Sequence, residues 1–414
     1  MKSWTIFLVL LVGFIDYMGI GLVYPLFSSV LFDRKIDLLH MQASNALRGF
    51  YLGVLLSLMP IFQLITAPIW GRLSDQKGRK KILLLSLSIS ALSYLIGVFG
   101  LTYKSLVFLI FSRGLAGIGG GSISVVQASL ADASTEENKA HVFGLFNMVL
   151  GFGFTIGPFL GGKLSDPGFL KFASYSLPFW FAFVVVCINA FFVAFFFQET
   201  RAIDIASAQK KTLFFASFKK AMHAQKIRLL FVCAFIFSFG WSFFFEFIPV
   251  YLIGQYRFRS PDIGNFYAYA GGLYALSCAF LIKPVVKRFT ADIVFLASLL
   301  LAGCYVLLFL WVKDAAYLWI YVPALLFLIA LVYPTLTAMI SNWAPKQEQG
   351  ETLGILQSVQ SAAFALSPLF SGSLVGLYDQ MPVIVGGASM LLAGTVFGSF
   401  CLYELIKNRD KNQA

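Results

Sequence analysis

Charged residues are scarce in this chain of 414 residues, since Asp, Glu, Lys and Arg together make up only 12% of it. Hydrophobic residues make up 59% and aromatic residues 17%, and the mean hydropathy is +0.82. A soluble fold of this length could not bury so much apolar surface. The composition therefore argues against an ordinary soluble protein and predicts a chain that lies in a lipid bilayer.

Cysteine and histidine are also few and dispersed. The five cysteines stand singly in apolar stretches without C-x-x-C spacing, and the three histidines are not grouped with them. Disulfide frameworks and zinc sites are therefore not expected. The sequence also lacks a Walker motif, a nucleophile paired with a base, and a separate soluble domain. These absences argue against transport driven directly by ATP, and against an enzyme or a signalling scaffold. No cofactor is expected.

Apolar windows long enough to cross a membrane recur along the sequence, each close to the length of about 20 residues that one helical span needs. Six windows come first, at 4–31, 46–70, 82–101, 105–131, 141–163 and 175–197. Six more follow a polar stretch, at 229–253, 262–284, 291–312, 316–341, 352–377 and 382–406. We expect an all-α integral membrane protein of twelve transmembrane helices, with a six-helix bundle over 1–198, a cytoplasmic linker over 199–228, and a second bundle with a short tail over 229–414.

Basic residues gather on one side of the predicted spans. If the N-terminus is cytoplasmic, that side receives the cluster at 72–81, the linker and the C-terminal tail, whereas the other side receives few. The positive-inside rule then places both termini and the linker in the cytoplasm. Because this orientation explains the net charge of +12, no nucleic-acid partner is expected.

The two halves of the sequence resemble each other at an offset of 210 residues. The offset pairs Asp132 with Asn342, Gly144 with Gly354, Asn147 with Gln357, and Pro158 with Pro368. Such internal similarity is typical of transporters built from two parallel repeats. The two predicted bundles are therefore expected to be pseudo-symmetric.

The loop after the second span combines glycine, acid and base at Gly71, Asp75, Gly78 and Arg79. Glycine permits a tight turn, and an aspartate can pair with an arginine or with a helix start. A merely positive-inside loop would leave Asp75 and the glycine spacing unexplained. The run resembles the G-x-x-x-D-x-x-G-R-x-x signature of the major facilitator superfamily, in which this loop latches the two halves on the cytoplasmic side. The resemblance implies a gate role for Asp75 and Arg79, and Asp132 is expected to be a helix cap or a partner of the latch arginine.

The fifth span carries a second motif of this family. The pattern G-x8-G-x3-G-P-x2-G-G, the family's antiporter motif, is matched by Gly144, Gly153, Gly157, Pro158, Gly161 and Gly162. Such a helix is expected to bend at its proline and to pack closely through its glycines. Simple helix packing would account for the glycines alone, whereas the full resemblance favours export over uptake.

The first span is similar over 14–25 to the opening helix of proton-coupled drug exporters, especially the tetracycline/proton exporters. At 1.5 Å per residue, Asp16 lies about 18 Å inside one membrane boundary and Arg113 about 14 Å inside the other. An ionisable residue near the midplane is costly unless it is protonated, paired or facing water. We expect Asp16 to carry the coupled proton and Arg113 to tune it, because burial and a nearby guanidinium act on a carboxyl group in opposite directions. The alternative is a static ion pair that holds the first and fourth spans together.

Glu246 is the other acid deep within a predicted span, among the aromatic residues of the seventh. It is interpreted as a site for a cationic substrate or a second proton, or else as a residue near the outer mouth. Further polar and aromatic candidates for the substrate cavity are Tyr24, Gln63, Gln127, Asn147, Trp241, Tyr333, Gln357 and Gln360. Taken alone, each of these side chains is more often an interhelical hydrogen bond or a lipid-interface anchor than a ligand of the substrate.

The sequence departs from the tetracycline exporters at two acids. Their acid in the helix after the latch loop is replaced here by Ser93, and 293–312 contains no counterpart of their ninth-helix acid. Because those acids handle substrate and protons in that subgroup, we do not expect this chain to export a metal–tetracycline complex.

Together these patterns predict a secondary active transporter, a proton-coupled efflux antiporter of small amphipathic or drug-like molecules that works by alternating access. It is expected to be a monomer in the bacterial inner membrane, with protons, a small-molecule substrate and the lipid bilayer as its partners. The alternative is a proton-coupled exporter or importer of a specific endogenous metabolite such as a siderophore, since Arg113 and Glu246 could recognise a charged ligand.

Overall fold

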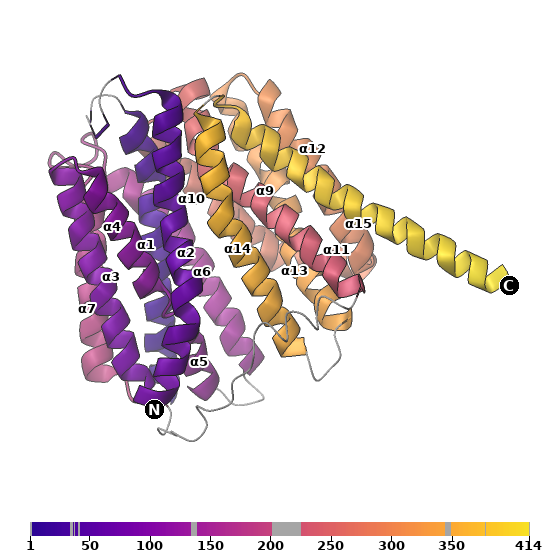
Figure 1. Cartoon of the computed structure of the whole chain (residues 1–414), viewed down its shortest axis with the longest axis horizontal. Helices are drawn as coiled ribbons and strands as arrows, with labels where there is room; N and C mark the ends of the chain where they lie inside the picture. Colours follow the sequence, from indigo (N-terminus) through magenta and orange to yellow (C-terminus); the bar gives the residue numbers. More distant parts are fainter. Residues whose placement is uncertain are drawn as a thin grey trace. The chain divides into compact units, whose positions relative to one another are not determined.

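The computed structural model describes residues 2–33, 36, 38–39, 42–133, 139–200, 225–343, 349–376 and 378–413, and within these ranges it is helical without strands (Figure 1). The helices of the first half are α1 (Lys2–Phe32), α2 (Asn45–Lys77), α3 (Arg79–Thr102), α4 (Leu106–Gly120), α5 (Ile123–Ala133), α6 (Lys139–Leu164) and α7 (Leu177–Phe196). Those of the second half are α9 (Gln225–Tyr256), α10 (Ser260–Leu276), α11 (Ile282–Arg288), α12 (Ala291–Leu308), α13 (Leu318–Trp343), α14 (Gln349–Val375) and α15 (Met381–Gln413).

Each of the twelve apolar windows corresponds to a helical segment, so the expectation of an all-α membrane fold is confirmed. The fourth window is divided into α4 and α5, and the eighth consists of α10, a π-helical turn at Ser277–Leu281, and α11. Nine helices in the described part of the chain are long and apolar enough to cross a membrane. Helices of this kind satisfy all of their backbone hydrogen bonds internally, as a span within lipid requires.

Local sequence explains where α2 begins and ends. Ser44 caps its N-terminus, where the hydroxyl accepts a hydrogen bond of 3.2 Å from the Leu47 N–H. Pro60 and Pro68 lie within the helix and each removes a backbone donor. Gly78 follows the helix with φ of 92°, a conformation that glycine adopts without strain, and so turns the chain directly into α3.

The break between α4 and α5 falls at consecutive glycines, and neighbouring side chains satisfy the backbone there. The indole of Trp70 donates to the Ile118 carbonyl at 2.6 Å, and the Gln63 amide donates to the Gly120 carbonyl at 3.1 Å. Both donors come from α2, so this helix is fastened to the broken one.

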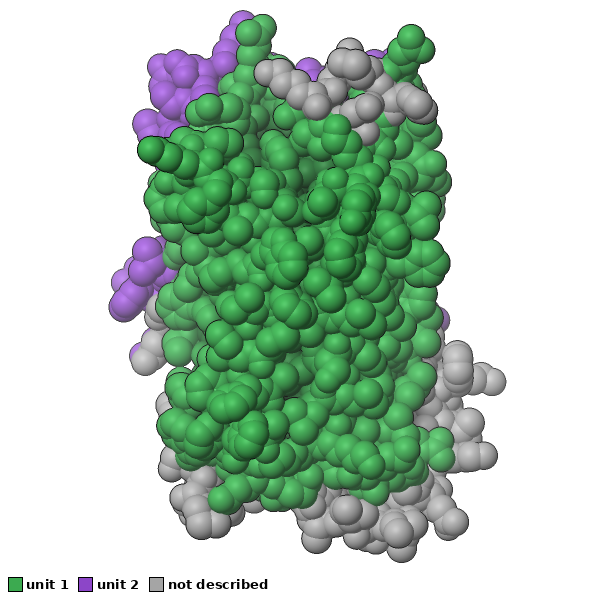
Figure 2. All heavy atoms as spheres, turned by 90° about the vertical axis from the view of Figure 1, so that its left-hand side faces the viewer, with its two compact units in different colours: residues 1–211, 249–275, 368–377 green, residues 212–248, 276–367, 378–414 purple. Residues whose placement is uncertain are grey.

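The chain divides into two compact units (green and purple in Figure 2). Unit 1 consists of Met1–Lys211, Pro249–Ala275 and Pro368–Leu377, and unit 2 of Thr212–Ile248, Leu276–Ser367 and Tyr378–Ala414. Within unit 1, α1 packs along α6, and α3 packs against α4 and α7; within unit 2, α12 packs against α13 and α15. The expected bundle boundaries at 198 and 229 stay a prediction, and most of the expected linker lies outside the described residues.

Candidate functional site

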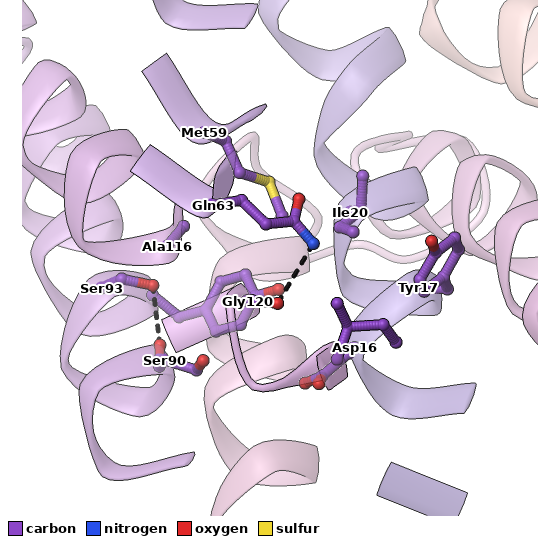
Figure 3. A pocket seen from close by; sticks show the side chains of 11 residues that line it. Asp16, Tyr17, Ile20, Met59, Gln63, Ser90, Ser93, Ala116 and Gly120 are labelled. Atoms are coloured by element: carbon purple, nitrogen blue, oxygen red, sulfur yellow. Dashed lines mark hydrogen bonds between the residues drawn. The ribbon is translucent and has the colours of Figure 1, made fainter. Parts of the chain in front are cut away.

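A small polar cavity lies next to Asp16 within unit 1 (Figure 3). Asp16 and Tyr17 reach it from α1, Met59 and Gln63 from α2, and Tyr94 from α3. The remaining lining residues are Ile20, Ser90, Ser93, Ala116, Gly120 and Ile123. Its volume of about 20 Å³ is enough for one water molecule, which needs about 10–15 Å³ on this measure. The cavity is therefore suited to a proton or a water and not to a substrate.

The carboxyl group of Asp16 has little hydrogen bonding around it. The Ser122 side chain, at the break between α4 and α5, is its hydrogen-bonding neighbour. The Oδ2 atom is buried and has no hydrogen-bond partner among the described residues. A charged carboxylate is costly in such surroundings, whereas a protonated one could donate its own O–H.

Arg113 of α4 lies beside this cavity and behind one of its walls, with only 2% of its surface exposed. Its Nη2 atom is 2.8 Å from the sulfur of Met59, which itself lines the cavity. The guanidinium also lies over the ring of Phe27 in α1, 5.5 Å from the ring centre. Tyr94 is within electrostatic reach of both Asp16 and Arg113, and its hydroxyl touches α1 at Gly19. Met59 thus contacts Arg113 and lines the cavity of Asp16, and the tuning of Asp16 by Arg113 stays a prediction.

The motif loop forms a compact charged cluster around Arg79. This side chain is only 3% exposed, and its guanidinium lies 2.8 Å from Asp75 and 3.0 Å from Asp132 at the end of α5. It also donates to the hydroxyl of Ser74. Of the two roles expected for Asp132, the structure shows the partner of the arginine. Gly71 and Gly78 frame the cluster, and Gly78 supplies the turn described above.

Glu199 completes this cluster, and sequence reasoning did not single it out. Its carboxylate accepts hydrogen bonds from the backbone N–H groups of Arg79 at 2.9 Å and Lys80 at 3.1 Å. These are free donors at the first turn of α3, where a negative charge is favourable. An acid directly after an apolar span, as in Gln198-Glu199-Thr200, was the available signal. It ties the end of the sixth span to the motif loop.

The glycines of the antiporter motif face two different helices. A Cβ atom on Gly153 would lie 2.7 Å from the Phe14 carbonyl, and one on Gly157 would lie 2.8 Å from the Leu22 nitrogen, both in α1. A Cβ atom on Gly161 would also strike the backbone of α1, at Leu22. One on Gly162 would instead lie 3.1 Å from the Cα of Gly264 in α10.

Pro158 lies in the same stretch of α6, with its ring against Gly21. The motif thus holds α6 in backbone contact with the helix that carries Asp16, a contact that side chains larger than hydrogen would prevent. Gly144 falls in α6, but its surroundings lie outside the described residues.

Glu246 lies in unit 2 and is buried, with 3% of its surface exposed. Its Oε1 accepts a hydrogen bond of 3.0 Å from Ser242, one turn earlier in α9. Trp241 stacks on Phe245 at 5.0 Å, so the acid lies on a helix rich in aromatic side chains. Ser238, Ser242 and Glu246 follow each other at intervals of four residues and form one buried polar stripe. The interior position differs from the alternative expectation of a water-exposed site at the outer mouth.

The other cavity candidates are distributed over both units. Gln63 lines the cavity of Asp16. Gln127 in α5 and Gln357 in α14 are exposed, and Gln360 is half-buried. Tyr333 in α13 contacts the ring of Phe237 at 5.2 Å. The side chains of Tyr24 and Asn147 lie outside the described residues. Only Gln63 among the described candidates therefore joins Asp16 at one cavity.

Comparison with known proteins identifies the family. The model of the Major Facilitator Superfamily matches residues 9–333. The chain belongs to the Major Facilitator Superfamily. This major facilitator is 30% identical to a tetracycline resistance protein, class H, of Pasteurella multocida, over 95% of the chain and 96% of the relative. It is 28% identical to the multidrug resistance protein 2 of Bacillus subtilis, over 94% of the chain and 93% of the relative.

Solved structures agree with this assignment at the level of the fold. A bacterial homologue of the human lysosomal transporter Spinster, in an inward-facing and unoccupied conformation, matches with a TM-score of 0.74 and 15% identity over 96% of this chain and 98% of that one. The human organic anion transporter MFSD10 matches with a TM-score of 0.67 and 20% identity over 96% and 99%. This major facilitator is thus a multi-pass membrane transporter and not an enzyme.

Proposed function

We propose that this major facilitator is a proton-coupled exporter that exchanges protons for a small amphipathic or drug-like molecule. The observation that carries the proposal is the carboxyl group of Asp16, which faces a water-sized cavity and whose Oδ2 atom is buried without a hydrogen-bond partner among the described residues. An ionisable residue kept inside a membrane span is a functional site by default. The relatives named for tetracycline and multidrug resistance support a role in export.

In this proposal Asp16 takes up a proton on one side of the membrane and releases it on the other. Protonation removes a charge that burial disfavours and supplies an O–H donor for the cavity. Arg113 lies behind Met59, which lines the same cavity, and is proposed to tune the balance between the two states of the carboxyl group from there. The balance then depends on whether water reaches the cavity.

The cluster around Arg79 is the proposed latch of the cytoplasmic side. Four acceptors converge on Arg79 and the start of α3, from Asp75, Asp132, Ser74 and Glu199. Charge-assisted hydrogen bonds of this kind are stronger than neutral ones and depend on geometry. A small displacement of α2 against α5 would break several at once, so the cluster fits a two-state element. In this proposal the motif loop and both termini lie on the cytoplasmic side. The chain is proposed to work as a monomer in the bacterial inner membrane.

The substrate is proposed to be amphipathic, and Glu246 is proposed to meet its positive charge. A buried carboxylate among aromatic rings supplies both an anion and π faces for a cation. The two acids missing at Ser93 and within 293–312 argue against a metal–tetracycline complex as cargo. A dedicated transporter of one endogenous metabolite receives less support, because the two relatives are named for resistance to drugs.

Transport in proteoliposomes under an imposed pH gradient, screened over cationic and neutral compounds, tests the proposal. We expect accumulation of amphipathic compounds against their gradient, abolished when the pH gradient is collapsed. Transport that is indifferent to the pH gradient would contradict proton coupling. A disruption strain with a nutritional or iron defect and no drug sensitivity would favour the metabolite alternative.

A further inference from the structure

One side of α6 is apolar and exposed over much of its length. The side chains on this side recur at intervals of three or four residues, and we call them the α6 strip: Met148, Phe152, Ile156 and Phe159. They are 36–51% exposed, whereas Phe146, which faces α1, is 1% exposed. At 1.5 Å per residue the strip is about 17 Å long, close to the thickness of about 15 Å of one leaflet of the hydrocarbon core. The strip therefore offers an apolar surface as long as one leaflet is thick.

Lys163 ends the α6 strip, one turn after Phe159 on the same side of the helix. Its ammonium lies 5.9 Å from the centre of the Phe159 ring and 5.7 Å from that of Phe169. Among the described residues no carboxylate lies within 4.0 Å of it. Because aromatic faces attract a cation without neutralising it, the positive charge of Lys163 stays available to an anion.

The loop after α6 is folded so that Phe169 lies beside this lysine. Asp166 organises the turn: its Oδ1 atom accepts the Gly168 N–H at 3.0 Å, and its carbonyl accepts the Phe169 N–H at 3.0 Å. The same loop carries Lys171, which is exposed. With two lysines and one aspartate, the segment 163–171 has a net charge of +1. The lysine is thus held in a defined aromatic setting, unlike a side chain that merely extends toward water.

An exposed apolar strip that ends in a cation is complementary to one kind of molecule. A long apolar chain can cover the strip, and an anionic head can meet the ammonium where the hydrocarbon layer gives way to the headgroups. Phospholipids combine these two parts and surround any chain that spans a membrane. Lysine binds a phosphate group as a point charge through a charge-assisted hydrogen bond.

We propose that the α6 strip binds one phospholipid molecule, with an acyl chain along the strip and the phosphate group at Lys163. The site lies apart from the cavity of Asp16, with which it shares no residue, and it goes beyond the proposed transport function. In the proposed orientation this end of α6 lies in the outer leaflet. A lipid bound here would cover the side of α6 that is turned away from α1.

Native mass spectrometry of the purified full chain, titrated with phosphatidylglycerol, tests the site. We expect one molecule to stay bound under collision energies that remove other lipids, and Lys163→Gln to bind it at least tenfold more weakly. Lys163→Arg keeps the charge and should bind within about twofold of the wild type. The exposed Lys313→Gln is the matched control and keeps wild-type binding. Equal binding by the wild type and Lys163→Gln overturns the proposal.

A variant without a charge change tests the apolar part of the site. Phe159→Ala should weaken binding of phosphatidylglycerol at least fivefold, whereas Phe191→Ala, at an exposed position of α7, should not. A diacylglycerol glycolipid without a phosphate group should bind at least tenfold more weakly than phosphatidylglycerol. Wild-type binding by Phe159→Ala, or equal binding of the glycolipid, overturns the proposal. A dimer of the chain that is lost in Lys163→Gln, with no lipid retained by the wild type, would assign the strip to a second copy and also overturns it.

Discussion

Arg79 and Asp132 are separated by more than fifty positions in the sequence, yet the Nε atom of the arginine lies 3.0 Å from Oδ2 of the aspartate. The same guanidinium lies 2.8 Å from Asp75 and also contacts Ser74. One buried base thereby joins the end of α2, the start of α3 and the end of α5. The cluster concentrates several interactions on a single side chain, which makes that side chain the natural point to perturb.

Replacing Arg79 by alanine should weaken both stability and transport. The substitution leaves two carboxylates without their base, and because both are partly exposed we expect a loss of about 2 kcal/mol, below the 3–5 kcal/mol of a fully buried pair. Arg79→Lys should recover only part of the lost stability, since an ammonium lacks the fixed fork of donors with which the guanidinium serves three acceptors. Thermal unfolding in detergent measures the effect. The exposed Lys81→Ala is the control, and equal stability of the two alanine variants would contradict the latch.

Removing the carboxylate of Glu199 should loosen the first turn of α3. Its two hydrogen bonds to backbone donors resemble a helix cap, for which alanine substitution costs about 1 kcal/mol. Glu199→Ala is therefore expected to lower the melting temperature, and Glu199→Gln to lower it less because the amide still accepts one bond. The neighbouring exposed Gln198→Ala serves as the control. If Glu199→Ala has the same melting temperature as the wild type, the capping role of Glu199 is wrong.

Two glycines of α6 offer a matched pair for testing the antiporter motif. A Cβ atom on Gly151 would meet nothing within 4 Å, whereas one on Gly157 would strike the backbone of α1 at Met18 and Leu22. Alanine is favoured over glycine in a helix by about 1 kcal/mol, so Gly151→Ala should be neutral or stabilising. Gly157→Ala should be destabilising, because overpacking typically costs about 1–3 kcal/mol and backbone cannot give way easily. Thermal unfolding and transport of the two variants, compared with each other, decide whether the motif glycine Gly157 is needed for close packing of α6 on α1.

Neutralising Glu246 should affect the transport of cationic substrates more than that of neutral ones. If its buried carboxylate meets the positive charge of the cargo, Glu246→Gln should raise the KM for a monovalent cation at least tenfold and leave that for a neutral compound within about twofold. Glu404→Gln is the control, since Glu404 pairs with Lys226 at a partly exposed position. Equal losses for both substrates would assign Glu246 to proton coupling or to structure.

The fold was predictable because its strongest determinant is local. A window of apolar residues must be helical in lipid, so each predicted span was found without knowledge of its neighbours. Depth along a helix is also local, and it drew attention to Asp16 and Arg113; the side chain of Arg113 is buried and Asp16 lines a small cavity. The turn at Gly78 was also predictable from local sequence, because few residues other than glycine adopt a positive φ.

The details of the site were not predictable, because they depend on which helices face each other. Met59 reads in the sequence as an ordinary apolar residue, yet its sulfur contacts Arg113 and its side chain lines the cavity of Asp16. Glu199 looked like the beginning of a polar linker, although its carboxylate binds residues 120 positions earlier. Neither contact follows from periodicity or composition. Only the packing of α2 against α4, and of the end of the sixth span against α3, brings these groups together.

Proton movement catalysed by Asp16→Asn in proteoliposomes tests the central claim most directly. An internal pH dye and a labelled substrate are followed together, with the exposed Asp314→Asn as the control. An amide at this position cannot gain or lose a proton, so we expect no substrate-driven proton flux and no accumulation against a gradient, while downhill exchange of substrate persists. An Asp16→Asn variant that still concentrates substrate to the wild-type level under an imposed pH gradient would contradict the account.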